Sequence, residues 1–502
     1  MASLFLYSEM IDQSESFPSP MKLKDMIKSS LDTPVIFKNQ IKSWSIPWTT
    51  SDFTEKYGST LLDFRVVPKS YKGISWEAQH KFEEATISQF IAWQNNENSL
   101  LDSNNPFKRY QKEEFWSYSS YNYMNSVFPG DSILQAVDWS VFGFPGVTGN
   151  ESTFWLGSEG ANTPCHFDSY GCNLVAQIVG RKKWILFPPT DTAFMYPTRI
   201  PYEESSVFSS VNILNPDLSQ HVLFKKSHPY IAVLEPGDVL FVPKKWWHFV
   251  LSIDEVTISM NTWIKLDSDP QCRLEEGIAR ALMASLISYY EPEIETWLNP
   301  KEELVPPEEA LKYINTSMKE LNEMKRKNNE LDKTAKRTKV CKILEESDVH
   351  SGTCKEKVIH DIFSSNYIEK VKSVAFHEWL TDTVQLRSLD APMSENSNLL
   401  KIVNSFVHPD VIAFSERSYK TRKLLDVYNL NSFSAAILHQ KDSRNKPTGR
   451  YKCSFCYYST DRTTSFKNHQ LVHSGERPYK CPICSFGFTT KQNLRRHLPL
   501  HK

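Results

Sequence analysis

Four short apolar runs between residues 174 and 242 form the clearest pattern of the chain. They span Leu174 to Val179, Trp184 to Phe187, Ile231 to Leu234 and Val239 to Val242. Turn residues separate the two members of each pair, with Gly180 in the first turn and Pro236-Gly237 in the second. Short apolar runs on either side of such turns predict two β-hairpins. Repeated antiparallel strands of this kind favour a sandwich or a jelly roll.

The pattern changes after about residue 268, and from there to residue 440 it is mainly that of helices. The segment from Leu274 to Ile287 repeats apolar residues at helical spacing, which predicts a helix that packs on the β region or on a second subunit. Residues 317 to 342 are highly charged and basic, so they indicate an exposed helix or a flexible segment. A solvated face explains these charges better than a nuclear-localisation signal. Residues 441–450 have the composition of a linker.

Two histidines and an aspartate stand out within the β region. His166 and Asp168 form a His-x-Asp pair, and His248 follows 80 residues later. Alternate residues of a strand point to the same face, so His166 and Asp168 are expected to lie side by side. Two imidazoles and one carboxylate on one face of a metal are the ligands of mononuclear iron(II) oxygenases. A single histidine or His-x-Asp pair is more often an ordinary core or surface feature, so the surrounding residues must decide.

The surrounding segments resemble the JmjC family, and in particular its hydroxylase-like branch. The resemblance covers roughly residues 30 to 265 and is carried by five segments: Gly157 to Asp168, Asn173 to Pro189, Leu234 to Pro243, Trp246 to His248 and Thr257 to Trp263. It implies a mainly β catalytic domain over residues 1–267, with its core at about 120–265. The fold expected is the double-stranded β-helix, a cupin-like jelly roll whose mouth holds a metal and a small ligand.

The same resemblance implies a binding site for Fe(II) and 2-oxoglutarate. Iron is expected on His166, Asp168 and His248, and the cosubstrate contacts are expected from Thr163, Lys182, Asn173, Asn261 and Tyr123. A lysine suits the far carboxylate of the cosubstrate, because a charge-assisted hydrogen bond offsets the loss of hydration on burial. Asn173 lies one position further from Asp168 than the hydroxylase pattern has it. Tyr123 is preferred to Tyr118 and Tyr121 as the tyrosine of this site.

The reaction implied uses oxygen to hydroxylate a C–H bond and, at the same time, to convert 2-oxoglutarate into succinate and carbon dioxide. Hydroxylation of a protein side chain is favoured over lysine demethylation, because Trp246-Trp247-His248 resembles the hydroxylase branch and no reader domain for methylated histone tails is evident. A non-catalytic JmjC binding protein is the alternative. The order of the regions is similar to that of family members associated with small heat-shock proteins, so such a partner is expected. The helix at 268 to 290 is a candidate homodimer interface.

Two copies of Cys-x2-Cys-x12-His-x3-His follow near the end of the sequence. They predict two small ββα zinc fingers at residues 451–473 and 479–501, with Zn(II) on Cys453, Cys456, His469 and His473 and on Cys481, Cys484, His497 and His501. Two thiolates on a β-turn and two imidazoles one helical turn apart make a closed tetrahedral site. The histidines explain the spacing better than a redox Cys-x-x-Cys does.

The charge of this tail agrees with contact to DNA or RNA. From residue 441 onward there are thirteen Lys or Arg against three Asp or Glu, although the whole chain has a net charge of −1. The docking geometry of such fingers makes Arg462, Ser465, Asn468, Thr490, Asn493 and Arg496 the expected base-reading residues. Binding to protein is the alternative, and a tail joined from another gene is a third, since fingers are not expected on this kind of JmjC protein.

Cysteine usage and hydropathy point to the cytoplasm or the nucleus. Besides the cysteines of the fingers, Cys165, Cys172, Cys272, Cys341 and Cys354 remain, an odd number without the spacing of a disulfide framework. No apolar run approaches the roughly twenty residues of a membrane span, so no membrane contact is expected.

Overall fold

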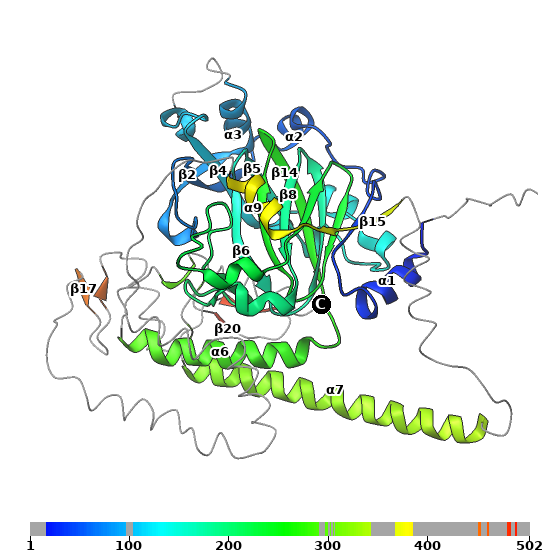
Figure 1. The fold of residues 1–502 in the computed structure, drawn as a ribbon. Helices are drawn as coiled ribbons and strands as arrows, with labels where there is room; N and C mark the ends of the chain where they lie inside the picture. The colour runs from blue at the N-terminus through cyan, green and yellow to red at the C-terminus, as the bar shows by residue number, and fades with distance from the viewer. Residues whose placement is uncertain are drawn as a thin grey trace, which may run out of the picture.

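The computed structural model describes residues 17–96, 104–290, 297–299, 302, 305, 307–342, 367–384, 450–452, 459–460, 479–482 and 487–488. Two large antiparallel sheets face each other and form the body of the molecule (Figure 1). Among the described helices, none is both long and apolar enough to cross a membrane.

The larger sheet has nine strands in the order β15-β1-β12-β7-β14-β5-β4-β2-β3. Their bounds are β15 Ile368–Lys370, β1 Val35–Phe37, β12 Val239–Val242, β7 Cys172–Val179, β14 Val256–Ile264, β5 Ser152–Ser158, β4 Phe115–Tyr123, β2 Leu61–Pro68 and β3 Lys81–Thr86. The smaller sheet has seven strands in the order β16-β11-β8-β13-β6-β10-β9. Their bounds are β16 Lys372–Ser373, β11 Tyr230–Leu234, β8 Lys182–Phe187, β13 Trp247–Ser252, β6 Asn162–Asp168, β10 Ser206–Ser209 and β9 Pro197–Thr198. Two facing antiparallel sheets confirm the predicted cupin-like jelly roll.

The predicted strands exist, but the two predicted hairpins are wrong. Strand β7 pairs with β12 and β14, whereas β8 pairs with β11 and β13. Each short turn therefore carries the chain from one sheet to the other. Strand β7 therefore pairs with β12, and β8 pairs with β11. The two strands joined by a short turn belong to different sheets. An apolar run that is buried on both faces does not reveal which neighbour it bonds, and the turn residues alone suggested the wrong partner.

Three apolar clusters hold the sheets in place. Between the sheets, alternate residues such as Trp184, Leu186, Leu234 and Leu240 meet in one cluster. The residues between them point outward, so that Ile185 and Phe187 join a second cluster on the outer face of the smaller sheet. The outer face of the larger sheet packs under the helices near the N-terminus in the third cluster. The inward-pointing side chains of β8 therefore lie in the space between the two sheets.

Short helices lie against both sheets and connect their strands. The α-helices are α1 Pro20–Ser29, α2 Thr50–Tyr57, α3 Ile87–Gln94, α4 Met124–Val127 and α5 Ile133–Ala136. The 3-10 helices are η1 Glu77–Gln79, η2 Pro106–Arg109, η3 Trp139–Phe142, η4 Gly149–Glu151, η5 Pro189–Phe194 and η6 Val222–Lys226. Helix α3 begins at a capping box in which the Thr86 side chain accepts from the Gln89 backbone N–H, and the Gln89 side chain accepts from that of Thr86.

Two long helices follow the sheets and lie side by side (Figure 1). Helix α6, Asp269–Tyr290, confirms the helix predicted from Leu274 to Ile287, and α7 spans Pro307–Lys342. Their contact is apolar, with Leu274 and Ala281 against Ala310 and Ile314. A buried ion pair ties α6 to the sheets, because Arg199 donates to both carboxylate oxygens of Glu276 at 2.8 and 2.6 Å. Helix α6 therefore packs on both α7 and the β region.

Residues 367–384 differ from the mainly helical segment predicted for this part of the chain. Strand β15 pairs with β1 at one edge of the larger sheet, and β16 pairs with β11 at one edge of the smaller sheet. Helix α9, Phe376–Val384, then places Trp379, which is fully buried, in the outer cluster of the smaller sheet. The segment covers two sheet edges that would otherwise expose unpaired backbone groups.

The tail contains two short hairpins of identical register. Strands β17 Tyr451–Lys452 and β18 Ser459–Thr460 pair in one, and β19 Tyr479–Lys480 and β20 Gly487–Phe488 pair in the other. Of the predicted zinc ligands only Cys481 is described, and it is buried. The other ligands Cys453, Cys456, His469, His473, Cys484, His497 and His501, the base-reading residues Arg462, Ser465, Asn468, Thr490, Asn493 and Arg496, and nearly all of the linker lie outside the described residues.

Candidate metal centre

The predicted iron ligands meet on the inner face of the smaller sheet. His166 on β6 and His248 on β13 are direct cross-strand partners, and their ring centroids lie 4.2 Å apart. The His166 Nε2 atom lies 3.8 Å from Asp168 Oδ1. One ligand atom from each of the three residues lies within 4.8 Å of the others, a spacing that suits a shared metal ion.

Neighbouring groups orient all three side chains toward this common point. The Nδ1 atoms of His166 and His248 each lie 2.9 Å from a backbone carbonyl, that of Pro164 and that of Trp246 respectively. A carbonyl only accepts, so each Nδ1 carries the proton and each Nε2 keeps its lone pair for a metal. Burial, and then the nearby His248, lower the pKa of His166 to about 4, so it is neutral at pH 7. Both histidines are therefore prepared to act as ligands.

Asp168 is held by the ring of a tryptophan from the opposite sheet. The Trp263 Nε1–H donates to Asp168 Oδ2 over 3.1 Å, which leaves Oδ1 toward the histidines. Trp263 lies on β14, so the contact joins the larger sheet to the metal site. Groups of this kind, which fix a ligand from behind, usually matter for metal affinity nearly as much as the ligands do.

A register shift between β6 and β13 brings Thr163 to the same face as the ligands. His248 pairs with His166, but Val250, two residues on, pairs with Thr163, three residues back. The extra residue of β6 is a β-bulge, and it reverses the alternation of side chains at that point. Without the bulge, Thr163 would point to the outer face of the sheet. Thr163 therefore shares the inner face with His166 and Asp168 only because of this bulge.

Lys182 points into the same interior space and is buried. Its Nζ donates to Ser259 Oγ at 2.8 Å and to the Tyr118 hydroxyl at 3.3 Å. Burial alone lowers the pKa of this amine to about 7, and among the described residues no carboxylate forms an ion pair with it. A buried ammonium without a counter-charge is costly, so its presence fits an anionic ligand.

The tyrosine beside Lys182 is Tyr118, and the choice of Tyr123 is corrected. Tyr118 is buried, whereas Tyr123 is 39% exposed at the end of β4. The register of β4 against β5 shifts between Ser119 and Asn122, so the alternation of side chains changes before Tyr123 is reached. The glycine at position 157 is the one signal in the sequence that could have favoured Tyr118. Gly157 is the cross-strand partner of Tyr118, and a Cβ at Gly157 would lie 2.8 Å from the tyrosine ring. A glycine inside a strand often marks such a close approach.

Asn173 and Asn261 lie together in a hydrogen-bonded network. Asn261 Nδ2 donates to Asn173 Oδ1 over 2.8 Å, and Asn261 Oδ1 accepts from Trp155 Nε1 over 2.7 Å and from the Thr153 hydroxyl. The donors on Oδ1 fix which way the Asn261 amide points. Both asparagines are buried between the sheets, although Asn173 departs by one position from the expected spacing.

Trp184 is an inner-face residue that the sequence reasoning missed. It follows Lys182 by two residues on β8, and its ring lies 5.7 Å from that of His248. The side chain is 5% exposed, yet its Nε1 has no hydrogen-bond partner among the described residues. An unpaired buried N–H is rare, so it indicates an acceptor that the described residues do not supply. The period-two spacing from Lys182 was the available signal.

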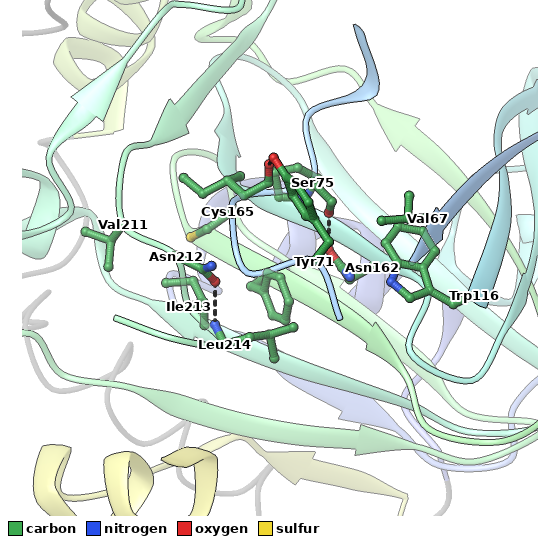
Figure 2. A pocket seen from close by; sticks show the side chains of 14 residues that line it. Val67, Tyr71, Ser75, Trp116, Asn162, Cys165, Val211, Asn212, Ile213 and Leu214 are labelled. Atoms are coloured by element: carbon green, nitrogen blue, oxygen red, sulfur yellow. Dashed lines mark hydrogen bonds between the residues drawn. The ribbon is translucent and has the colours of Figure 1, made fainter. Parts of the chain in front are cut away.

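A separate pocket lies on the other side of β6 (Figure 2). Cys165 and Phe249 line it, and these residues alternate with the metal ligands His166 and His248 along their strands. Ser75 also lines it and donates to Asn162 Oδ1 over 2.7 Å, as Figure 2 shows. Val67 and Trp116 of the larger sheet also line the pocket, and none of the three candidate metal ligands does.

Comparison with known proteins agrees with the geometry. Residues 24–269 match the family model described as a cupin-like domain. These residues form a cupin-like domain. HSPB1-associated protein 1 from Rattus norvegicus is 46% identical over 288 residues, which cover 57% of this chain and 59% of that protein. The chain thus spans less than two thirds of this relative.

Two more distant relatives bear other names. Lysine-specific demethylase JMJ31 from Arabidopsis thaliana is 38% identical over 112 residues, 22% of this chain and 20% of that protein. The tRNA wybutosine-synthesizing protein 5 of Homo sapiens is 38% identical over 119 residues, 24% of this chain and 35% of that protein. The cupin-like domain contains all three candidate metal ligands, while β15, β16 and α9 add to its sheets from beyond the matched range.

Proposed function

We propose that the chain is an Fe(II)- and 2-oxoglutarate-dependent oxygenase that hydroxylates a protein side chain. One observation carries this proposal: three iron-type ligands share an interior space with Lys182, a buried amine that has no anionic partner among the described residues. Neutral imidazoles and a carboxylate suit iron(II), and a buried ammonium suits the far carboxylate of a dianionic cosubstrate.

The residues present suit both an iron ion and 2-oxoglutarate. His166, Asp168 and His248 would hold the metal through the two Nε2 atoms and Asp168 Oδ1. Lys182, with the hydroxyls of Tyr118 and Thr163, would hold the far carboxylate, and the unpaired Trp184 Nε1–H supplies a further donor to the same space. When bound, iron and the cosubstrate would together activate oxygen, which is the oxidant for hydroxylation of a C–H bond. The chain supplies orientation and a site enclosed by buried strands.

Hydroxylation is preferred to demethylation on the resemblance of Trp246-Trp247-His248 to the hydroxylase branch. The named relatives do not separate the two, since one is called a lysine-specific demethylase and another a tRNA wybutosine-synthesizing protein. Mass spectrometry of the product distinguishes the reactions, because hydroxylation adds one oxygen atom and demethylation releases formaldehyde. Loss of methyl groups without a hydroxylated product would reverse the preference.

A small heat-shock protein is the partner that we propose. The support is the name of the relatives, of which five are called HSPB1-associated protein 1 or its homolog. This proposal is tested by co-purification of the full chain with a small heat-shock protein. An unrelated cupin domain serves as the control. A partner retained equally by the control would contradict the proposal.

The central experiment measures metal and cosubstrate binding without turnover. Under anaerobic conditions, the wild-type chain should bind one Fe(II), and 2-oxoglutarate should bind only when the metal is present. His166→Ala should lose the metal. His228→Ala is a matched control, because His228 also contacts an aspartate, Asp191 at 2.9 Å, but is largely exposed and lies outside the metal site. Equal metal binding by the two variants would refute the assignment.

The tail supports a second candidate function. We propose that it binds two zinc ions, because the hairpins β17–β18 and β19–β20 recur 28 residues apart with the same pairing, as expected of two copies of one module. Metal analysis of the full chain should find two zinc ions, and Cys481→Ala should remove one while Cys341→Ala removes none. An unchanged zinc content in Cys481→Ala would contradict the fingers. Binding of DNA or RNA by this tail stays a prediction.

A further inference from the structure

A lysine amine and a cysteine sulfur are in contact where the turn between β12 and β13 meets helix α6. The Lys244 Nζ atom lies 3.3 Å from Cys272 Sγ and donates a hydrogen bond to it. The same amine donates to Ser268 Oγ at 2.6 Å. Two hydrogen bonds to one short segment of chain therefore hold the amine beside the sulfur, and the proposed oxygenase reaction uses neither group.

The neighbouring lysine has a different partner. Lys245 forms an ion pair with Glu275, in which Nζ lies 3.6 Å from Oε2. Among the described residues Lys244 forms no ion pair with a carboxylate, and its amine contacts a hydroxyl and a thiol instead. The two lysines are adjacent in sequence and differ in what their amines contact, so Lys245 is a matched control for Lys244.

The contact lies just below the surface. Cys272 is 4% exposed, Lys244 is half-buried and Ser268 is exposed, so small molecules in solution can approach the pair. Burial raises the pKa of the Cys272 thiol, while the charge and the hydrogen bond of Lys244 act in the opposite direction. The lysine therefore favours the thiolate, which is the form of cysteine that oxidants attack.

The distance between nitrogen and sulfur decides which covalent link fits. At 3.3 Å, a single oxygen atom placed between Lys244 Nζ and Cys272 Sγ needs only a small approach of the two side chains. A direct bond between nitrogen and sulfur needs a much closer approach, against the hydrogen bond that holds the amine to Ser268. The arrangement therefore favours a bridge through one oxygen atom.

We propose that Lys244 and Cys272 form a reversible cross-link, Nζ–O–Sγ, with dioxygen as the oxidant. The ammonium first releases a proton to water. The S–O and N–O bonds then form, while the O–O bond, the S–H bond and one N–H bond break. One oxygen atom stays in the bridge, and the other leaves as water with the two hydrogens. Dioxygen gains four electrons, of which sulfur and nitrogen lose two each, and two equivalents of a dithiol reverse the reaction.

The cross-link would fasten a turn that holds the candidate metal centre. The turn from β12 to β13 leads into the strand of His248, and the Lys245 backbone N–H donates to the Asp168 carbonyl oxygen at 3.1 Å. Cys272 lies in the first turn of α6, where Asp269 accepts from the Gly171 backbone N–H at 2.9 Å. A link between the two elements closes a loop of the chain, so the oxidised protein should unfold at a higher urea concentration than the reduced protein.

Peptide mass spectrometry of the full chain tests the link. The reduced wild-type chain is freed of reductant, exposed to ordinary or 18O-labelled oxygen, treated to block free thiols and digested with trypsin. Residues 227–245 should be joined to residues 266–273. One oxygen gained and two hydrogens lost should add about 14 Da to the sum of the two peptides, and labelled oxygen about 2 Da more. Dithiothreitol should separate the peptides.

Matched variants identify the two atoms. Lys244→Met and Cys272→Ser should lose the joined peptides, whereas Lys245→Met and Cys172→Ser should keep them. Cys172 is a close control, because it is buried and lies within range of the charge of Lys244, but its sulfur contacts the Ile264 carbonyl oxygen. The comparison of the wild-type chain with and without oxygen does not depend on the folding of any variant.

Three results would overturn the proposal. They are the absence of joined peptides in the oxidised wild-type chain, joined peptides that persist in Lys244→Met, and a mass that shows two hydrogens lost without an oxygen gained. The last result would indicate a disulfide or a direct bond between nitrogen and sulfur. His166→Ala, which is expected to lose the metal, should still form the link, so failure of the oxygenase proposal and failure of the cross-link are distinguishable.

Discussion

Replacing Lys182 by methionine tests the role of the buried amine most sharply. The substitution keeps an unbranched side chain of similar length and removes the charge. Burial lowers the pKa of Lys182 from 10.5 to about 7. At about 1.4 kcal/mol per pKa unit, the ammonium destabilises the folded, ligand-free chain by roughly 4 kcal/mol at pH 7. Loss of the hydrogen bonds to Ser259 and Tyr118 offsets about 2 kcal/mol of that gain. We therefore expect Lys182→Met to raise the free energy of unfolding by about 2 kcal/mol.

The effect depends on pH in a defined direction. Between pH 7 and 10.5 the unfolded chain holds more protons at Lys182 than the folded chain, so the stability of the wild type rises with pH in this window. At pH 9 the cost of the ammonium falls to about 2 kcal/mol, and the advantage of the variant should disappear. Below pH 7 the cost is fully present.

Urea unfolding followed by tryptophan fluorescence, in the presence of a chelator, measures these differences at pH 7 and at pH 9. In a parallel series with Mn(II), saturating 2-oxoglutarate should stabilise the wild type by about 3 kcal/mol at a hundredfold excess over its dissociation constant. It should leave Lys182→Met unchanged. A variant that is less stable than the wild type at both pH values, or that is stabilised equally by the cosubstrate, would refute the reasoning.

Three further predictions follow from the contacts. Tyr118→Phe should weaken 2-oxoglutarate binding roughly three- to tenfold by calorimetry and Tyr123→Phe should not, so equal effects would contradict the placement of Tyr118 beside the amine. Glu276→Gln leaves the buried guanidinium of Arg199 without its counter-charge and should cost roughly 3 kcal/mol in urea unfolding, while an unchanged midpoint would argue against a structural ion pair. Trp379→Ala should cost about 3 to 5 kcal/mol, and full stability in this variant would show that α9 does not pack on the smaller sheet.

The three candidate metal ligands could be brought together from the sequence because their signal is local. His166 and Asp168 sit two apart on one strand, and the segments around them and around His248 carry a family resemblance. Lys182 was predictable for the same reason. In each case the short stretch of chain that holds the residue also fixes the face to which it points, so its placement between the sheets could be predicted.

The remaining features depend on pairing between distant segments. The two bulges, one in β6 and one in β4, moved Thr163 inward and separated Tyr118 from Tyr123, and neither has a distinct signal in the residues. Strands β15 and β16 lie about a hundred residues after β14 in the sequence. They are strands because they pair with β1 and β11, and the local sequence does not show this pairing.

Succinate formation from 2-oxoglutarate tests the central claim most directly. Full-length protein, purified without oxygen, is given iron(II), ascorbate and oxygen, with and without a purified small heat-shock protein, beside a variant that combines His166→Ala and Asp168→Ala. We predict succinate that disappears in the variant, with one oxygen atom added to a side chain of the substrate protein. Bound iron and cosubstrate without any succinate, in every substrate tested, would contradict the oxygenase and favour a binding role for the cupin-like domain.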